Sequence, residues 1–123
     1  MQVKPNLNEL KQFAKSGQYK TAPVCMEILS DFGTPIQVLQ ILKNVSTHCY
    51  LLESVSDHEN WGRYTFLGYD PKLEITCLDG QLRIGSMRFE TTNPGTYIKQ
   101  IIEEHKSARP DGMPPFTGGL VGY

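Results

Sequence analysis

The sequence predicts an α+β fold in which an antiparallel β-meander packs with about three helices. Short runs that alternate apolar and polar residues predict the strands, and turn signals such as Asp79-Gly80 separate them. Three stretches with apolar residues at helical spacing predict the helices, and each follows a residue type that commonly caps helices.

Each predicted helix has its own start signal. Asn6 is followed three residues later by Glu9, which is the pattern of a capping box, and Gly17 is a typical helix stop. Thr34-Pro35 and Asn93-Pro94 each combine a capping residue with a proline at the first helical position. We therefore expect helices over residues 7–16, 35–44 and 94–105.

The other apolar runs predict six strands. The first begins near Pro23, where the missing N–H of a proline is tolerated. The run that ends at Glu53 and the run at 64–67 are expected to lie side by side. The last four strands are expected in meander order between residues 63 and 91. The predicted strands are 22–29, 47–53, 64–67, 73–78, 81–84 and 87–90.

Composition is that of an ordinary globular protein. Of the 123 residues, 39% are hydrophobic and 20% are charged, which is too apolar for a disordered chain. The formal net charge of −1 gives no sign of a basic face for nucleic acid or a polybasic patch for a membrane, so neither partner is expected. The sequence has no apolar run of membrane-spanning length and no signal-peptide core, which favours the cytoplasm.

The three cysteines do not indicate a metal site. Cys25, Cys49 and Cys77 show none of the CxxC or Cys/His spacings that bind zinc. Each lies in an apolar, strand-like run, where a reduced thiol packs as a small hydrophobic residue. We therefore expect all three cysteines in the core and no metal bound by this chain.

Polar residues gather where one predicted strand ends and its neighbour begins. Glu53 and Ser54 follow an apolar run, and Arg63 precedes the next run. An acid, a hydroxyl and a guanidinium are the groups that bind the ammonium and the carboxylate of a free amino acid. The alternative is that Glu53 and Arg63 form a solvated surface ion pair and that Ser54 begins a turn.

Three motifs resemble, in order, the N-terminal region of anthranilate synthase component I. They are LLES at residues 51–54, WGRYTFLG at 61–68 and PPFTGGLVGY at 114–123. The resemblance covers nearly the whole chain. It implies that residues 1–123 form an incomplete N-terminal region, with a connector at 107–115 and, at 116–123, the start of a strand that belongs with the missing half.

The resemblance also implies an activity for the parent protein. The family converts chorismate and glutamine, or ammonia, to anthranilate, pyruvate and glutamate in tryptophan biosynthesis. Its chorismate and Mg²⁺ sites lie in the C-terminal half, so this chain alone is expected to hold no cofactor and to be catalytically inactive. A glutamine amidotransferase subunit is the implied partner of the parent. The missing half also leads us to expect an uncovered apolar face and self-association of this chain.

In this family, the N-terminal region contributes to the feedback-inhibition site for L-tryptophan. By resemblance, Ser54 is an inhibitor contact and Glu53 is the candidate partner of the ligand's ammonium. Arg63 matches a basic position near the ligand, and Pro23 matches a proline on the indole side. Leu52, from the same LLES motif, is assigned to the site with them.

Three alternatives remain open. The folate-pathway relative, aminodeoxychorismate synthase component I, shares the superfamily, although LLES with WGRYTF favours the first assignment. A non-catalytic module that docks a glutamine amidotransferase subunit is the second. A hydrolase built on Ser54, Asp57 and His58 is the third, and it is disfavoured because no GxSxG elbow surrounds the serine.

Overall fold

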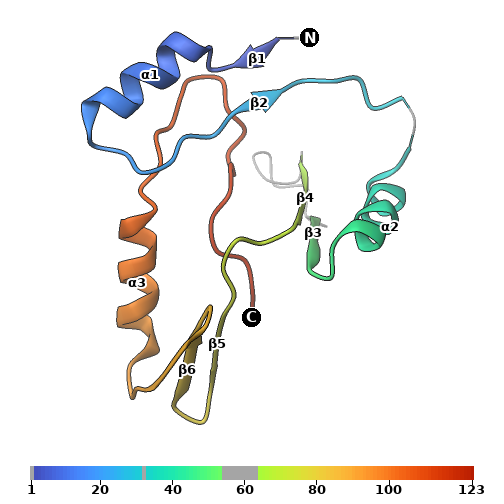
Figure 1. Cartoon of the computed structure of the whole chain (residues 1–123). Helices are drawn as coiled ribbons and strands as arrows, with labels where there is room; N and C mark the ends of the chain where they lie inside the picture. The colour runs from blue at the N-terminus through green and yellow to red at the C-terminus, as the bar shows by residue number, and fades with distance from the viewer. Residues whose placement is uncertain (1, 32, 54–63) are drawn as a thin grey trace. The chain divides into compact units, whose positions relative to one another are not determined.

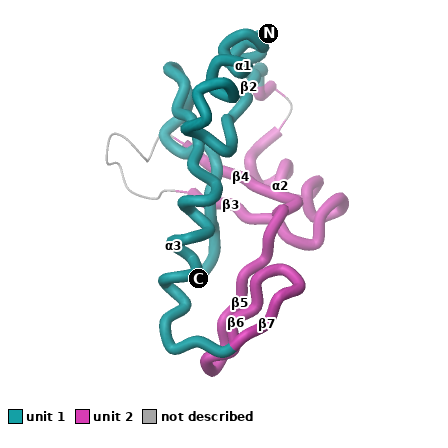
Figure 2. Tube along the Cα trace, turned by 60° about the vertical axis from the view of Figure 1, so that its left-hand side comes forward, with its two compact units in different colours: residues 1–29, 90–123 teal, residues 30–89 magenta. Residues whose placement is uncertain are grey.

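The structure, a computed structural model, describes residues 2–31, 33–53 and 64–123 (Figure 1). Three helices and antiparallel strand pairs in these residues confirm the predicted α+β class. The chain divides into two compact units, one of residues 1–29 and 90–123 and the other of residues 30–89 (Figure 2).

Helix α1 (Leu7–Ser16) in the first unit begins and ends where the sequence predicts. The Asn6 side chain accepts from the backbone N–H of Glu9 at 3.0 Å, and the Glu9 carboxylate accepts from the N–H of Asn6 at 2.8 Å. This capping box satisfies two backbone donors that a helix start leaves without a partner. At the other end, Gly17 takes a left-handed conformation with φ of +67°, which glycine adopts without steric cost.

Two distant segments of the first unit run side by side after their helices end. The carbonyl of Lys106 accepts from the N–H of Lys20 at 2.8 Å, and the N–H of Ala108 donates to the carbonyl of Thr21 at 3.1 Å. The Thr21 hydroxyl also donates to the carbonyl of His105, at the end of helix α3 (Pro94–Glu104), at 3.2 Å. Ala108 is fully buried, so these bonds lie beside the packed centre of the unit.

The strands of the first unit are shorter than predicted. Strand β2 covers only Cys25–Met26 of the predicted 22–29, because it pairs with the two-residue strand β1 (Val3–Lys4). A strand needs a partner along its length to satisfy its backbone groups. Residues 116–123 have no regular secondary structure, and the strand expected there stays a prediction.

Helix α2 (Pro35–Val45) begins the second unit with another capping box. The Thr34 hydroxyl accepts from the N–H of Gln37 at 3.3 Å, and the Gln37 side chain accepts from the N–H of Thr34 at 2.9 Å. The helix packs against strands β3 (Cys49–Glu53) and β4 (Thr65–Tyr69), and its Leu39 and Leu42 are half-buried.

Strands β3 and β4 pair antiparallel, as predicted for the runs that flank the polar cluster. Their register runs from Cys49 opposite Tyr69 to Glu53 opposite Thr65. Glu53 and Thr65 are therefore the last paired residues at the end where the chain leaves β3 and enters β4.

The predicted four-stranded meander is wrong in one respect, because β4 is not part of it. Strands β5 (Ile75–Leu78), β6 (Gln81–Ile84) and β7 (Met87–Glu90) form a three-stranded sheet, and β4 pairs with β3 instead. Asp70, at φ of +49°, and Pro71 turn the backbone out of strand geometry directly after β4. The Asp79-Gly80 turn is as predicted, with positive φ at both residues.

The core of the described residues is small. Leu82 on β6, Ile101 on α3 and Ala108 are buried, whereas many large apolar side chains remain exposed. Cys25 and Cys49 are half-buried, but Cys77 is exposed, so its predicted place in the core is wrong. Cys77 lies on β5, an edge strand of its sheet, which leaves it less covered than a central strand would.

Among the described residues, no helix is long and apolar enough to cross a membrane.

Candidate functional site

The candidate site is the end of the β3–β4 pair. Leu52 lies opposite Phe66, and Glu53 lies opposite Thr65. The predicted residues Ser54 and Arg63, and also Asp57 and His58, lie outside the described residues.

Leu52 and Glu53 point to opposite faces of the strand pair, because side chains alternate along a strand. Leu52 shares its face with Tyr50, and Glu53 shares the other face with Leu51. A ligand that lies flat on one face would contact only one of the two. A ligand at the Glu53–Thr65 end of the strands would reach both.

Both predicted side chains at this strand end are accessible. Leu52 is 45% exposed, and Glu53 is exposed as well. Across residues 2–31, 33–53 and 64–123, no cation lies within ion-pair distance of the Glu53 carboxylate. A carboxylate in this setting can accept hydrogen bonds from an ammonium group that approaches from solvent.

The opposite end of the pair is tied to helix α2 by Ser46, the residue that follows the helix. The Ser46 hydroxyl donates to the carbonyl of His48 at 2.7 Å and accepts from the N–H of Asp70 at 3.0 Å. The beginning of β3 and the end of β4 are thus joined through one side chain. No sequence signal pointed to Ser46, because its partner Asp70 is 24 residues away.

The Tyr50 ring lies on the backbone of Gly68, directly across the strand pair. A Cβ atom at Gly68 would be 2.1 Å from Cε1 of Tyr50 and 2.5 Å from its Cζ. This contact was not predicted from the sequence. A signal was present, because a glycine inside a strand pattern often marks a close approach of another group.

Charged groups elsewhere in the second unit form weak surface contacts. The Glu74 carboxylate lies 3.9 Å from Nε2 of His48 and 3.8 Å from Nη2 of Arg83. These side chains are about half exposed, so each contact is expected to contribute less than about 1 kcal/mol. They are surface contacts and do not form a buried charged site.

Pro23 lies in the first unit and is half-buried. It follows Thr21 by two residues, and Thr21 is bonded to the segment after α3, so the backbone near Pro23 is well anchored. Its predicted place beside Leu52 and Glu53 stays a prediction.

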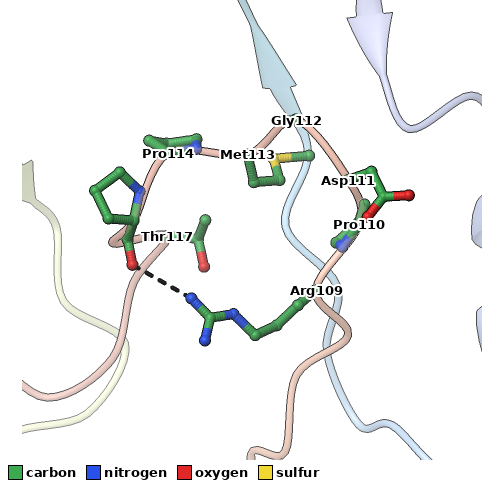
Figure 3. A pocket seen from close by; sticks show the side chains of 8 residues that line it. Arg109, Pro110, Asp111, Gly112, Met113, Pro114 and Thr117 are labelled. Carbon is green, nitrogen blue, oxygen red and sulfur yellow. Dashed lines mark hydrogen bonds between the residues drawn. The ribbon is translucent and has the colours of Figure 1, made fainter. Parts of the chain in front are cut away.

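A pocket of about 270 Å³ lies in the connector of the first unit (Figure 3). Nη2 of Arg109 donates to the carbonyl of Pro115 at 3.4 Å, which closes the loop on itself. None of the residues predicted for the amino-acid site lines this pocket. Its lining residues are Arg109, Pro110, Asp111, Gly112, Met113, Pro114, Pro115 and Thr117.

Comparison with curated sequences gives a consistent result. The chain is 38% identical over 123 residues to anthranilate synthase component 1 of Acetivibrio thermocellus, an alignment that covers 97% of this chain and 24% of that relative. It is 33% identical to the protein of that name from Pseudomonas aeruginosa, over 96% of this chain and 25% of the relative. The Aquifex aeolicus protein of that name is 32% identical, over 100% of this chain and 25% of the relative.

The chain thus spans about a quarter of the length of these relatives. No protein-family model and no solved structure matches it.

Proposed function

The chain is homologous to the N-terminal region of anthranilate synthase component 1, and we propose that it contributes one wall of a feedback-inhibition site for L-tryptophan. In this proposal, Glu53 accepts from the ligand's ammonium and Ser54 contacts the ligand beside it. Arg63 supplies positive charge near the carboxylate, and Leu52 and Pro23 provide apolar contacts.

The observation that carries the proposal is the pairing of Glu53 with Thr65. Ser54 is the next residue after Glu53, and Arg63 precedes Thr65 by two positions. Consecutive Cα atoms are about 3.8 Å apart, so covalent connectivity keeps both residues near this strand end. In the proposal, the acid, the hydroxyl and the guanidinium act together on one zwitterionic ligand.

The strand geometry favours a ligand at the Glu53–Thr65 end of β3 and β4. Leu52 and Glu53 point to opposite faces, so only an end-on ligand would use both. A charge-assisted hydrogen bond from the ammonium to Glu53 would contribute about 1.5–3 kcal/mol if closure of the site shields it from water.

The activity of the whole protein is part of the proposal. We assign it the conversion of chorismate and glutamine, or ammonia, to anthranilate, pyruvate and glutamate, with a glutamine amidotransferase subunit as partner. The names of the relatives support this over the folate-pathway alternative. The described residues contain no group of three or more His, Cys, Asp or Glu side chains that could hold a metal ion, and the Mg²⁺ of this activity is proposed to bind elsewhere in the whole protein.

Inhibition also requires that tryptophan prefer one conformation of the enzyme over another, because a ligand that binds both equally shifts no population. A site with walls on parts of the protein that move relative to each other would meet this requirement.

The direct test is Ser54→Phe in a full-length anthranilate synthase component 1 that carries this chain. The phenyl ring would fill the space of the ligand, so the tryptophan concentration for half-inhibition should rise at least about tenfold, the effect of losing about 1.4 kcal/mol of binding. Anthranilate formation without tryptophan should be largely unchanged, and fluorescence of anthranilate measures both.

Ser86→Phe is the matched control, because Ser86 is an exposed turn residue between β6 and β7. It should leave the inhibition curve where it is. If Ser54→Phe also leaves the curve unchanged, the assignment of Ser54 to the inhibitor site is wrong.

A further inference from the structure

We infer that Tyr50 and Gly68 are a positioning pair for this site: the ring packed on the glycine fixes the register of β3 and β4, and the register sets the directions of Leu52 and Glu53. The identity of the ligand rests on the proposed function. The structural part of the inference does not, because the register can be measured without any ligand.

With the Tyr50 ring where it lies, there is no room for a side chain at Gly68, so a substitution there would have to displace the ring. A Cβ atom there would lie 2.1 Å from Cε1, 2.5 Å from Cζ and 2.7 Å from Oη of Tyr50. All three distances are shorter than real Cβ contacts, so the ring occupies the volume that a side chain would need. A glycine weakens a strand because it packs no side chain, and an aromatic residue across from it compensates for that loss.

This contact is selective for one register. Gly68 lies between Leu67 and Tyr69, which are both large. A slip of β4 by one residue in either direction would place one of these side chains opposite Tyr50, where the ring already fills the space. Only the observed register puts a residue without a side chain under the ring.

The strand pair needs a contact that fixes its register because the connection between the two strands is long. Residues 54–64 join β3 to β4, whereas a two-residue hairpin turn would fix the register by its own geometry. At the far end, the bond from the N–H of Asp70 to the Ser46 hydroxyl is the other tie between the strands' ends. Tyr50 and Gly68 form the next-to-last pair at that same end, so the two contacts anchor it together.

A change of register would alter the site, because side chains alternate between the two faces of a strand. A one-residue slip moves every side chain of a strand to the other face relative to its partner. Glu53 would then no longer face Thr65, and the direction of its carboxylate relative to the strand pair would change. Tyr50 and Gly68 are thus positioning residues that act through Glu53 without touching the ligand.

The first measurement determines the register itself. Nuclear Overhauser contacts between Glu53 and Thr65, recorded on this chain, report whether the two residues are paired. We expect these contacts to be lost or displaced in Gly68→Ala and weakened in Tyr50→Ala, and to be retained in Tyr50→Phe, which keeps the ring. Gly95→Ala is the matched control, since the nearest atom to a Cβ there is 3.4 Å away.

Tyr50→Ala still tests the positioning role if Gly68→Ala does not fold, because it removes atoms and introduces no clash. Retention of the Glu53–Thr65 contacts at wild-type strength in both variants would overturn the positioning role.

The second measurement links the register to regulation in the full-length enzyme. Gly68→Ala should raise the tryptophan concentration for half-inhibition about tenfold or more, because a displaced Glu53 would lose its charge-assisted hydrogen bond to the ligand's ammonium. The KM for chorismate should not change, whereas general damage to the fold would also alter catalysis.

The two measurements separate the possible failures. A displaced register with an unchanged half-inhibition concentration would overturn the link to the ligand. A wild-type enzyme that tryptophan does not inhibit would refute the proposed function, while the register result would still decide the positioning role.

Discussion

Ser46→Ala should lower the free energy of unfolding of this chain by about 1–2 kcal/mol. The substitution removes a hydrogen bond of 2.7 Å to the carbonyl of His48, one of 3.0 Å from the N–H of Asp70 and a longer, local one of 3.3 Å from the N–H of His48. A typical intramolecular hydrogen bond contributes about 0.5–1.5 kcal/mol net, so the two shorter bonds give about 1–3 kcal/mol. Ser46 is only half-buried, and water can replace part of the loss, which places the expectation in the lower part of this range.

Ser16→Ala is a matched control for this experiment. The Ser16 hydroxyl also makes a 2.7 Å bond, but to the carbonyl of Phe13 within the last turn of α1, and it accepts a local 3.3 Å bond from the N–H of Gln18, both at an exposed position. Alanine is the better helix former, and water can reach the freed carbonyl, so the free energy of unfolding should change by less than about 0.5 kcal/mol.

Urea unfolding followed by circular dichroism at low protein concentration measures both variants. The slope of free energy against urea should not change, because the surface exposed on unfolding stays the same. Equal effects of Ser46→Ala and Ser16→Ala would show that the tie between α2, β3 and β4 contributes nothing beyond a local surface bond, and would refute the reasoning.

Two further predictions concern the rest of the chain. Asn6→Ala should cost about 1 kcal/mol in the same unfolding assay through loss of the capping box, whereas Asn44→Ala, at an exposed position inside α2, should not destabilise. The chain by itself should self-associate, because large apolar side chains are exposed, among them Leu29 at 82%, Leu78 at 75% and Val45 at 69%. Light scattering should give a mass above 13.9 kDa that rises with concentration, and a constant monomer mass would contradict this.

The elements that the sequence predicts well are those with local signals. The capping boxes at Asn6 and Thr34 and the turn at Asp79-Gly80 each depend on residues within three or four positions of one another. Their geometry follows from short-range hydrogen bonding and allowed backbone angles, which do not depend on the rest of the fold.

The partners of the strands were harder to predict, because pairing depends on residues far apart in the chain. The alternating runs after residue 63 fit a four-stranded meander equally well, and no local signal showed that β4 lies outside the sheet of β5, β6 and β7. The prediction that 47–53 and 64–67 are neighbours did identify this pair. The ends of β2 are set by its partner β1, which is only two residues long. A strand that short has no recognisable pattern in the sequence.

The candidate site shows the same division. Glu53 and Leu52 were located at a strand end from the sequence, and the structure confirms that position. Their opposite directions follow from strand alternation once the register is known. The roles of Ser46 and Gly68 require three-dimensional contacts, because each acts on a residue well separated in sequence.

The most direct test of the account is the crystal structure of the full-length protein with L-tryptophan bound. We expect the ligand at the Glu53–Thr65 end of β3 and β4, with its ammonium within hydrogen-bonding distance of the Glu53 carboxylate and with Ser54 in contact. An inhibitor bound elsewhere, with its amino and carboxyl groups remote from Glu53, Ser54 and Arg63, would contradict the account.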